Sequence, residues 1–193
     1  MNGKEIATFY ASSKQKWRQW LQKNHDKEQS VWLLCYKKQA NMPTISWSDA
    51  VDEALCFGWI DSTRKSLGDD RFIQFFCKRK PKSNWSKINK AKIEKLTDEG
   101  LMTKAGFASV ELAKKNGSWN ALDQVEELLI PKDLASAFRL QPGSKKYFTG
   151  LSQSVQKILL HWVAAAKRSE TRQKRIDELA EHAGRQTRPK QFL

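Results

Sequence analysis

Cysteine is scarce in this chain, and long apolar runs are missing from it. The three cysteines, Cys35, Cys56 and Cys77, are an odd number, and none lies in a CxxC pair or at metal-ligand spacing from a histidine. We therefore expect buried free thiols, as is usual in the reducing cytosol. No apolar stretch approaches the roughly 20 residues that span a bilayer, and the start of the chain lacks the apolar segment of a signal peptide. We expect a cytoplasmic protein without membrane insertion.

Acidic residues are too few to balance the basic ones. The chain has 35 Lys and Arg against 21 Asp and Glu, which gives a formal net charge of +14. The whole excess lies in two blocks of +7 each, residues 78–95 and residues 144–193. Such a concentration of charge suggests an anionic partner more than general solubility.

Enough apolar material is present to build a core. The 193 residues are 39% hydrophobic and include eight Trp, which disfavours disorder. Hydrophobic spacing predicts an α+β fold, with a small antiparallel sheet and helices in the N-terminal half and an all-helical C-terminal half. We expect an α+β part over residues 1–100 and a helical part over residues 101–184 packed on it as one compact unit. Residues 185–193 are expected to form a mobile basic tail.

The N-terminal half carries the strand signals. Residues 9–24 place Trp and Leu three and four positions apart, which indicates an amphipathic helix after a loose leader. Ser46, followed three residues later by an acid, predicts a capped helix that ends near Gly58. The sequence of residues 67–70 is typical of a hairpin loop. The predicted strands, which are short and rich in β-formers, cover residues 30–36, 59–63 and 71–77.

Helical spacing dominates from residue 86 onward. Thr103 is a predicted helix cap, and Pro131 stands at a predicted helix start. Ser152 is expected to cap a longer helix, with a break at residues 168–169. A final amphipathic stretch is expected to end at Gly184.

Two long motifs and several short ones give the chain a family resemblance. The long ones are Ser46-Trp-Ser-Asp-Ala-Val-Asp-Glu-Ala-Leu-Cys-Phe-Gly-Trp-Ile-Asp61 and Arg79-Lys-Pro-Lys-Ser-Asn-Trp-Ser-Lys-Ile-Asn89, and the short ones cover residues 100–106, 113–119, 131–133 and 166–172. In this order they resemble the YdeI/OmpD-associated family, whose members are also labelled bacteriocin-protection proteins, over roughly residues 46–176. Lys78 stands where we expect that family to have a Pro.

The resemblance implies a setting rather than a reaction. It implies a soluble, cytoplasmic bacterial protein, and it implies no particular reaction because the family is not defined by a biochemical activity. The family name associates its members with an outer-membrane porin and with resistance to bacteriocins or cationic peptides. It implies neither a catalytic residue nor a cofactor.

Residues 79–86 form the strongest candidate binding segment, because they follow a strand and open a helix. Arg79 and Lys82 are suited to hold a phosphate or carboxylate near a helix N-terminus, whose unpaired N–H groups favour an anion. Ser83 or Ser86 can cap that helix, and Trp85 can stack on a ring or base. The alternative is a helix cap with solvated lysines and a core Trp. Because the segment is not rich in Gly, it is no nucleotide P-loop.

A neighbouring strand can contribute to the same site. Alternation places Trp59 and Asp61 on one strand face, where Asp61 can pair with Arg79 or bind a cationic group. A pocket between this strand and residues 83–86 would favour ligand binding. Alternatively, Asp61 organises the turn or balances Arg64.

Three arginines suggest a different partner. Arg168, Arg172 and Arg175 share one face of a predicted helix through spacings of four and three residues. Such a track suits a phosphate backbone or an acidic protein, and nucleic-acid binding through the two basic blocks is therefore an alternative function. Glu170 and Lys174 favour an ordinary ion-paired surface instead. Arg172 is also an expected outer member of the anion site.

Catalytic motifs are not apparent. His25, His161 and His182 lie on three separate predicted helices without matching Asp or Cys motifs, so no general acid and base can be named. We therefore expect a non-catalytic protein that binds an anionic small molecule or an acidic protein partner, without a cofactor. An enzyme with an unrecognised site is a third hypothesis, and it needs a titratable residue with a perturbed pKa inside a cleft.

Overall fold

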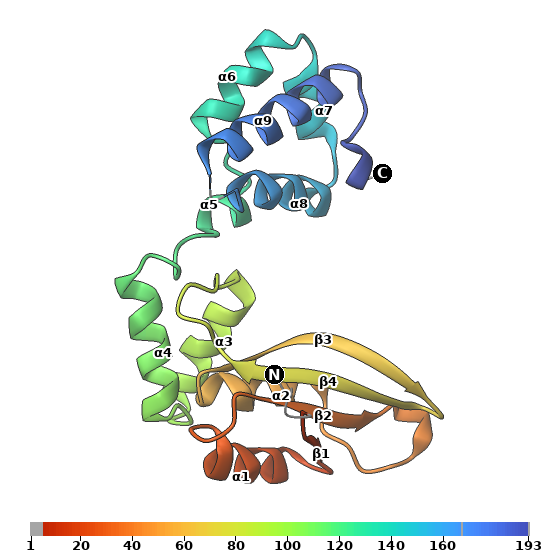
Figure 1. Ribbon diagram of the computed structural model, residues 1–193, viewed down its shortest axis with the longest axis vertical. Coiled ribbons are helices and arrows are strands. Elements are labelled where there is room, and N and C mark those ends of the chain that lie inside the picture. Colours follow the sequence, from red (N-terminus) through yellow and green to blue (C-terminus); the bar gives the residue numbers. More distant parts are fainter. Residues whose placement is uncertain (1–5, 167, 193) are drawn as a thin grey trace, which may run out of the picture. The chain divides into compact units, whose positions relative to one another are not determined.

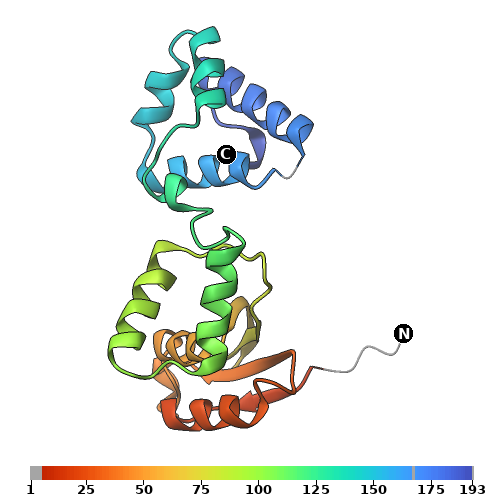
Figure 2. The same cartoon turned by 90° about the vertical axis from the view of Figure 1, so that its left-hand side faces the viewer.

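The computed structural model describes residues 6–166 and 168–192 and divides the chain into two compact units. The first unit covers residues 1–120 and the second covers residues 121–193 (Figure 1 and Figure 2). Each unit has its own cluster of buried hydrophobic side chains. Helix α4 (Lys104–Lys115) belongs to the first unit, although its residues were expected to begin the helical part.

A four-stranded sheet organises the first unit, in the order β1-β2-β4-β3. Strand β2 (Ser30–Tyr36) pairs antiparallel with β4 (Arg71–Lys78), which pairs antiparallel with β3 (Trp59–Gly68). These three strands confirm the predicted small antiparallel sheet. Strand β1 (Thr8–Tyr10) adds a parallel edge to β2 and makes the sheet mixed. Its three residues are too few for a recognisable alternation.

The hairpin between β3 and β4 lies where the sequence predicts it, but β3 extends beyond the predicted end at residue 63. Its exposed residues 62–66 carry hydroxyl and basic side chains, and basic side chains protect an edge strand from pairing with another chain. Asp69 and Asp70 both have positive φ angles, 44° and 56°. Two positive φ angles are typical of the type I′ turn that matches the twist of a hairpin.

Capping side chains define where the helices of the first unit begin. Helix α1 (Lys14–Asn24) begins after Ser13, whose hydroxyl accepts a hydrogen bond from the Lys16 N–H. It is therefore shorter than predicted, because β1 takes residues 8–10. Helix α2 (Trp47–Cys56) begins after Ser46, whose hydroxyl accepts a hydrogen bond from the Asp49 N–H as a capping residue does, and donates to the Asp49 carboxylate. Thr103 caps α4 through its hydroxyl, which accepts a hydrogen bond from the Gly106 N–H.

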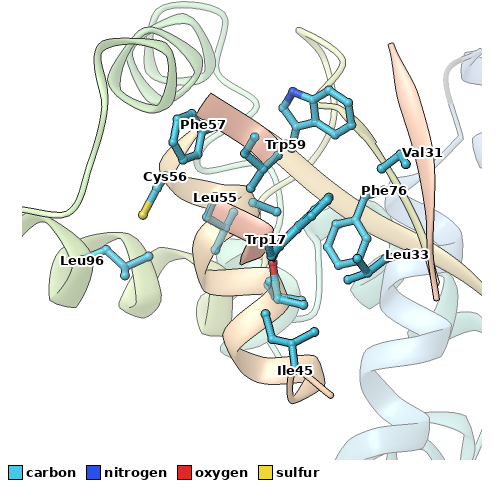
Figure 3. Close-up of a cluster of buried hydrophobic side chains, with 14 of the residues drawn as sticks. Trp17, Val31, Leu33, Ile45, Leu55, Cys56, Phe57, Trp59, Phe76 and Leu96 are labelled. Carbon is cyan, nitrogen blue, oxygen red and sulfur yellow. Dashed lines mark hydrogen bonds between the residues drawn. The ribbon is translucent and has the colours of Figure 1, made fainter. Parts of the chain in front are cut away.

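The core of the first unit lies between the sheet and its helices (Figure 3). Trp17 of α1 is fully buried and donates its indole N–H to the Ala50 carbonyl at 3.0 Å, which ties α1 to α2. The ring centroids of Trp17 and Phe76 of β4 lie 5.2 Å apart. Trp59 at the start of β3 is also fully buried, and its indole N–H donates to the His25 carbonyl.

Two glycines let α4 approach the end of α2 closely. A Cβ atom at Gly106 would lie 2.3 Å from the Cys56 carbonyl oxygen, closer than real Cβ atoms come. Gly58, with a φ of 72°, turns the chain from α2 into β3 beneath Ala105. The Thr103 hydroxyl donates to the same Cys56 carbonyl at 2.6 Å. Helix α4 is thus held beside the start of β3.

The second unit is helical, as predicted for the C-terminal half. Pro131 directly precedes α6 (Lys132–Leu140), and Ser152 caps α8 (Gln153–Ala164), in agreement with the sequence signals. Phe192 packs on Trp162, with ring centroids 5.5 Å apart. The expectation of a mobile tail over residues 185–193 did not anticipate this contact. Across the described residues, no helix is long and apolar enough to cross a membrane.

The elements of the second unit are α5 (Asp123–Glu126), α6 (Lys132–Leu140), α7 (Ser144–Gly150), α8 (Gln153–Ala164), α9 (Ser169–Gly184) and the short 3-10 helix η2 (Lys190–Phe192). In the first unit, α3 (Lys87–Asp98) and the 3-10 helix η1 (Lys38–Ala40) complete the set.

Candidate functional site

The backbone of Arg79 is fixed where β4 ends. The Lys78 N–H donates to the Gln29 carbonyl at 3.0 Å, and the Arg79 N–H donates to the Gly58 carbonyl at 2.9 Å. A Pro at position 78 has no N–H and could not make the first of these bonds. The Lys at this position therefore extends the hydrogen bonding of the strand up to Arg79.

The guanidinium of Arg79 is buried and incompletely paired. Its Cζ atom lies 3.6 Å from the centroid of the Trp85 ring, and Nη2 donates to the Asn84 carbonyl at 2.6 Å. Nε and Nη1 are buried and have no hydrogen-bond partner in the described part of the chain. Asp61, the acid expected to pair with Arg79, instead accepts hydrogen bonds from Trp47 Nε1 and Gln74 Nε2.

This arrangement is energetically costly for the isolated protein. Burial lowers the pKa of the Arg79 guanidinium to about 10, because a charged group is harder to accommodate away from water. The side chain nevertheless stays protonated at neutral pH. Each buried donor without an acceptor costs about 1–3 kcal/mol, and native proteins contain few of them. A missing acceptor is therefore the most informative feature of this site.

A groove of about 360 Å³ opens beside Arg79. Phe57, Trp59 and the Ala105–Ala108 turn of α4 supply its apolar wall, and Lys78 and Asp26 lie at its rim. Lys78 Nζ donates to the Asp26 backbone carbonyl at 2.8 Å, so its charge is not neutralised by that contact. The groove thus combines two cations and one carboxylate with an apolar surface.

The predicted residues of the 79–86 segment play unequal parts. Trp85 is 1% exposed and belongs to the core, so its ring supports Arg79 and is not open for stacking on a ligand. Ser86 caps α3, and the Ser83 hydroxyl donates to the Lys80 carbonyl within the turn. Lys82 is exposed to solvent. Only Arg79 of this segment lines the groove.

Of the two residues on the predicted strand face, Trp59 lines the groove and Asp61 does not. Trp59 lines the groove from within the core. Asp61 lies outside the groove, where its carboxylate holds the exposed Trp47 of α2 against the sheet. The cavity therefore lies between the start of β3 and α4, and not between β3 and residues 83–86.

Two of the three arginines of the predicted track are held by local contacts. Arg172 donates to both carboxylate oxygens of Asp133, at 2.7 and 3.2 Å, and this pairing holds the pKa of Asp133 below its usual range. Arg175 donates to the Trp162 carbonyl at 2.6 Å. Arg168 is exposed at the start of α9. Arg172 thus holds α6 to α9 and belongs to a different unit from the Arg79 groove.

Sequence reasoning missed His25, Lys78 and the α4 residues as parts of the groove. His25 lines the groove after α1 and packs on Phe57, with ring centroids 5.2 Å apart. These residues come from separate segments that meet only in the folded chain. The one local signal was Gly106, whose missing side chain lets α4 approach.

Reactive groups are sparse in the described residues. Burial raises the pKa of the Cys35 and Cys56 thiols to about 11, so both are protonated and poor nucleophiles at neutral pH. Residues 6–166 and 168–192 contain no group of His, Cys, Asp and Glu that could hold a metal ion. The site as described is suited to binding a charge and offers no arranged acid and base.

Two family models match the chain, one in each unit. A domain of unknown function, DUF8412, matches residues 9–109, and the model described as bacteriocin-protection, YdeI or OmpD-associated matches residues 127–186. The suspected family is thus confirmed, although both long sequence motifs lie in the part matched by DUF8412. Comparisons with curated proteins and with solved structures find no match. The chain therefore belongs to the DUF8412 family through its first unit and carries a bacteriocin-protection, YdeI or OmpD-associated segment in its second.

Proposed function

We propose that the first unit binds a small organic anion in the groove beside Arg79. The observation that carries this proposal is the buried guanidinium of Arg79, a side chain that lines the groove and has two nitrogen atoms without an acceptor. A carboxylate or phosphate oxygen that enters the groove supplies the missing acceptor, because charge-assisted hydrogen bonds from Arg to such groups are strong. The protein then recognises its ligand without transforming it.

The size and lining of the groove favour a small molecule over an acidic protein. About 360 Å³ is near the lower end of the range for ligand pockets, roughly 300–1,000 Å³. The apolar wall formed by Phe57 and the first turns of α4 suits a ligand with a compact apolar body. Lys78 adds a second cation at the rim, and the +7 block that begins there attracts anions from solution.

The family description gives this binding a setting. We place it in protection against bacteriocins or related envelope stress, where the ligand is a signal or a metabolite that the protein holds. A cytoplasmic location is part of the same proposal, and it is supported by the three free thiols of Cys35, Cys56 and Cys77.

Titration with phenyl phosphate, followed by Trp fluorescence, tests the proposal. Binding is expected to saturate and to change the emission, because the Arg79 guanidinium packs on the Trp85 ring at 3.6 Å. Arg79→Gln removes the charge and is expected to weaken binding by roughly tenfold or more, since a hydrogen bond to a charged group contributes about 1.5–3 kcal/mol. Inorganic phosphate should bind more weakly than phenyl phosphate, because it leaves the apolar wall uncovered.

Arg64→Gln is the matched control. Arg64 stacks on Phe72 of the same sheet, with its Cζ 3.7 Å from the ring centroid, and it lies outside the groove. Its replacement removes an equal charge and a similar stacking contact, and it should leave the titration unchanged. Equal weakening by both substitutions would show that net charge alone attracts the ligand and would refute the site. Tight binding of oligonucleotides with a steep salt dependence would instead support the nucleic-acid alternative.

A further inference from the structure

The second unit contains a larger pocket, which is distinct from the Arg79 groove. It has a volume of about 490 Å³ and lies between α8, the α5 turn and the side chains of Arg175 and Phe192. This volume is within the range of pockets that hold small ligands, roughly 300–1,000 Å³. Every residue that lines it belongs to the second unit.

Helix α8 presents two apolar faces: one is buried in the core of the second unit, and the other lies at the edge of that core, where Trp162 is partly buried and Ile158 is half exposed. Leu159, Leu160 and Val163 are buried in the core of the second unit. Ile158, Trp162 and Ala165, at spacings of four and three residues, form a second apolar stripe that lines the pocket. Ile158 is 51% exposed at the N-terminal end of this stripe. A surface helix normally needs one apolar face, so the second stripe is available to a ligand.

Aromatic side chains give the pocket a defined wall. Trp162 and Phe192 meet edge to face, with ring centroids 5.5 Å apart, at the end of the pocket nearest to η2. The edge-to-face arrangement is a favourable geometry for aromatic pairs. A flat or branched apolar body can pack against this pair and against Ile158 at the same time.

The charges around the pocket favour an anionic ligand. Arg175 lies over the Trp162 ring, with Cζ 5.3 Å from the centroid, and donates Nη1 to the Trp162 carbonyl. Within the described part of the chain, that carbonyl is its hydrogen-bond partner and no carboxylate pairs with it. Lys157 and Glu126 pair with each other at 2.8 Å on another side of the pocket. Two cations thus face one carboxylate.

We infer that this pocket is a second ligand site, for a small organic anion with an aromatic or branched apolar body. The apolar stripe of α8 and the aromatic pair bind the body, and Arg175 binds the anionic group. The inference does not depend on the function proposed for the Arg79 groove, because the residues are different and lie in the other unit. The sequence analysis treated Arg175 only as part of a basic track.

Fluorescence titration of the full chain with anilinonaphthalene sulfonate tests the inference, because this probe joins an aromatic body to an anionic group. Ile158→Glu places a negative charge on the apolar stripe at a half-exposed position, so the fold should be kept. We expect it to weaken binding at least about tenfold, through lost apolar contact and charge repulsion. Leu140→Glu is the matched control, since Leu140 is 80% exposed on α6 of the same unit and lies outside the pocket.

Two further arms identify the anionic contact and the site. The neutral analogue phenylnaphthylamine should bind less tightly than the sulfonate, and Arg175→Gln should remove most of this difference. Arg79→Gln should leave binding at this pocket unchanged, which separates it from the groove in the first unit. The inference is overturned if Ile158→Glu and Leu140→Glu bind alike, if the sulfonate and the neutral analogue bind equally to the unmodified chain, or if Arg79→Gln alone abolishes binding.

Discussion

At the scale of single residues, we expect the side chain of Arg79 to lower the folding stability of the first unit. Its charge is buried, its Nε and Nη1 atoms lack acceptors, and the ring of Trp85 supplies only partial compensation. Residues that act in binding often carry such local costs, because the missing interaction is reserved for a ligand. The same reasoning separates Arg79 from Arg172, whose guanidinium donates to Asp133 and to the Val163 carbonyl.

Replacement of Arg79 by Met should therefore stabilise the ligand-free protein. Met keeps much of the contact with Trp85 and removes the buried charge and its unsatisfied donors. We expect a gain of up to about 2 kcal/mol in the free energy of unfolding, measured by urea denaturation at neutral pH. A loss of stability in Arg79→Met would contradict the cost assigned to this cation.

The pH dependence of this gain provides a second check. Burial lowers the pKa of Arg79 in the folded chain to about 10, below its value in the unfolded chain. The folded state therefore binds fewer protons than the unfolded state above pH 10, and the cost of the cation is relieved as the pH rises. The difference in unfolding free energy between Arg79→Met and the unmodified chain should be largest below about pH 10 and shrink above it.

The sequence could indicate Arg79 but not its environment. A cation at the end of a strand, before a capping Ser, is a local pattern that pointed to an anion site. The burial of Trp85 and the engagement of Asp61 by Trp47 depend on contacts between distant segments. Periodicity in a single chain carries no information about such contacts.

At the scale of elements, the groove depends on how closely α4 approaches the turn after α2. Gly106 makes this approach possible, because a Cβ atom there would lie 2.3 Å from the Cys56 carbonyl oxygen. The Thr103 hydroxyl and its N–H both bond that carbonyl and hold the start of the helix in place. Ala105 and Ala108 then form one wall of the groove.

Gly106→Ala should displace α4 and lower both stability and anion binding. Forcing a side chain into a filled space costs about 1–3 kcal/mol, and we expect a loss in this range by thermal or urea unfolding. Phenyl phosphate binding should weaken because the wall moves away from Arg79. Gly150→Ala is the control, since Gly150 ends a helix and a Cβ atom there meets nothing within 4 Å. Equal effects of the two substitutions would show that α4 packing does not shape the site.

Elements with strong local signals were predicted well, and those without were not. The caps at Ser46 and Thr103 and the hairpin at Asp69 and Asp70 follow from side-chain chemistry within a few residues. Strand β1 was missed because backbone pairing with β2, not its own sequence, makes it a strand. The extension of β3 was missed because residues 64–66 are polar on both faces and show no alternation with apolar residues.

At the scale of the whole molecule, the structure and the family matches divide the chain at about the same place, some 20 residues beyond the boundary expected from the sequence. The DUF8412 match ends at residue 109 and the YdeI or OmpD-associated match begins at residue 127, on either side of the unit boundary at residue 120. Each unit has its own buried hydrophobic cluster. Each also has a cavity that is lined by two cations and one carboxylate. The two basic blocks of the sequence are likewise distributed one to each unit.

The Nε–H resonance of Arg79, followed in proton–nitrogen correlation spectra of the full chain, tests the central claim most directly. Arg79→Gln removes this signal and so assigns it. Because Nε is buried and has no acceptor, addition of phenyl phosphate should move the resonance strongly downfield and saturate with the same affinity as the fluorescence change. A resonance that stays in place while the ligand binds would contradict the account, since the anion would then be held elsewhere.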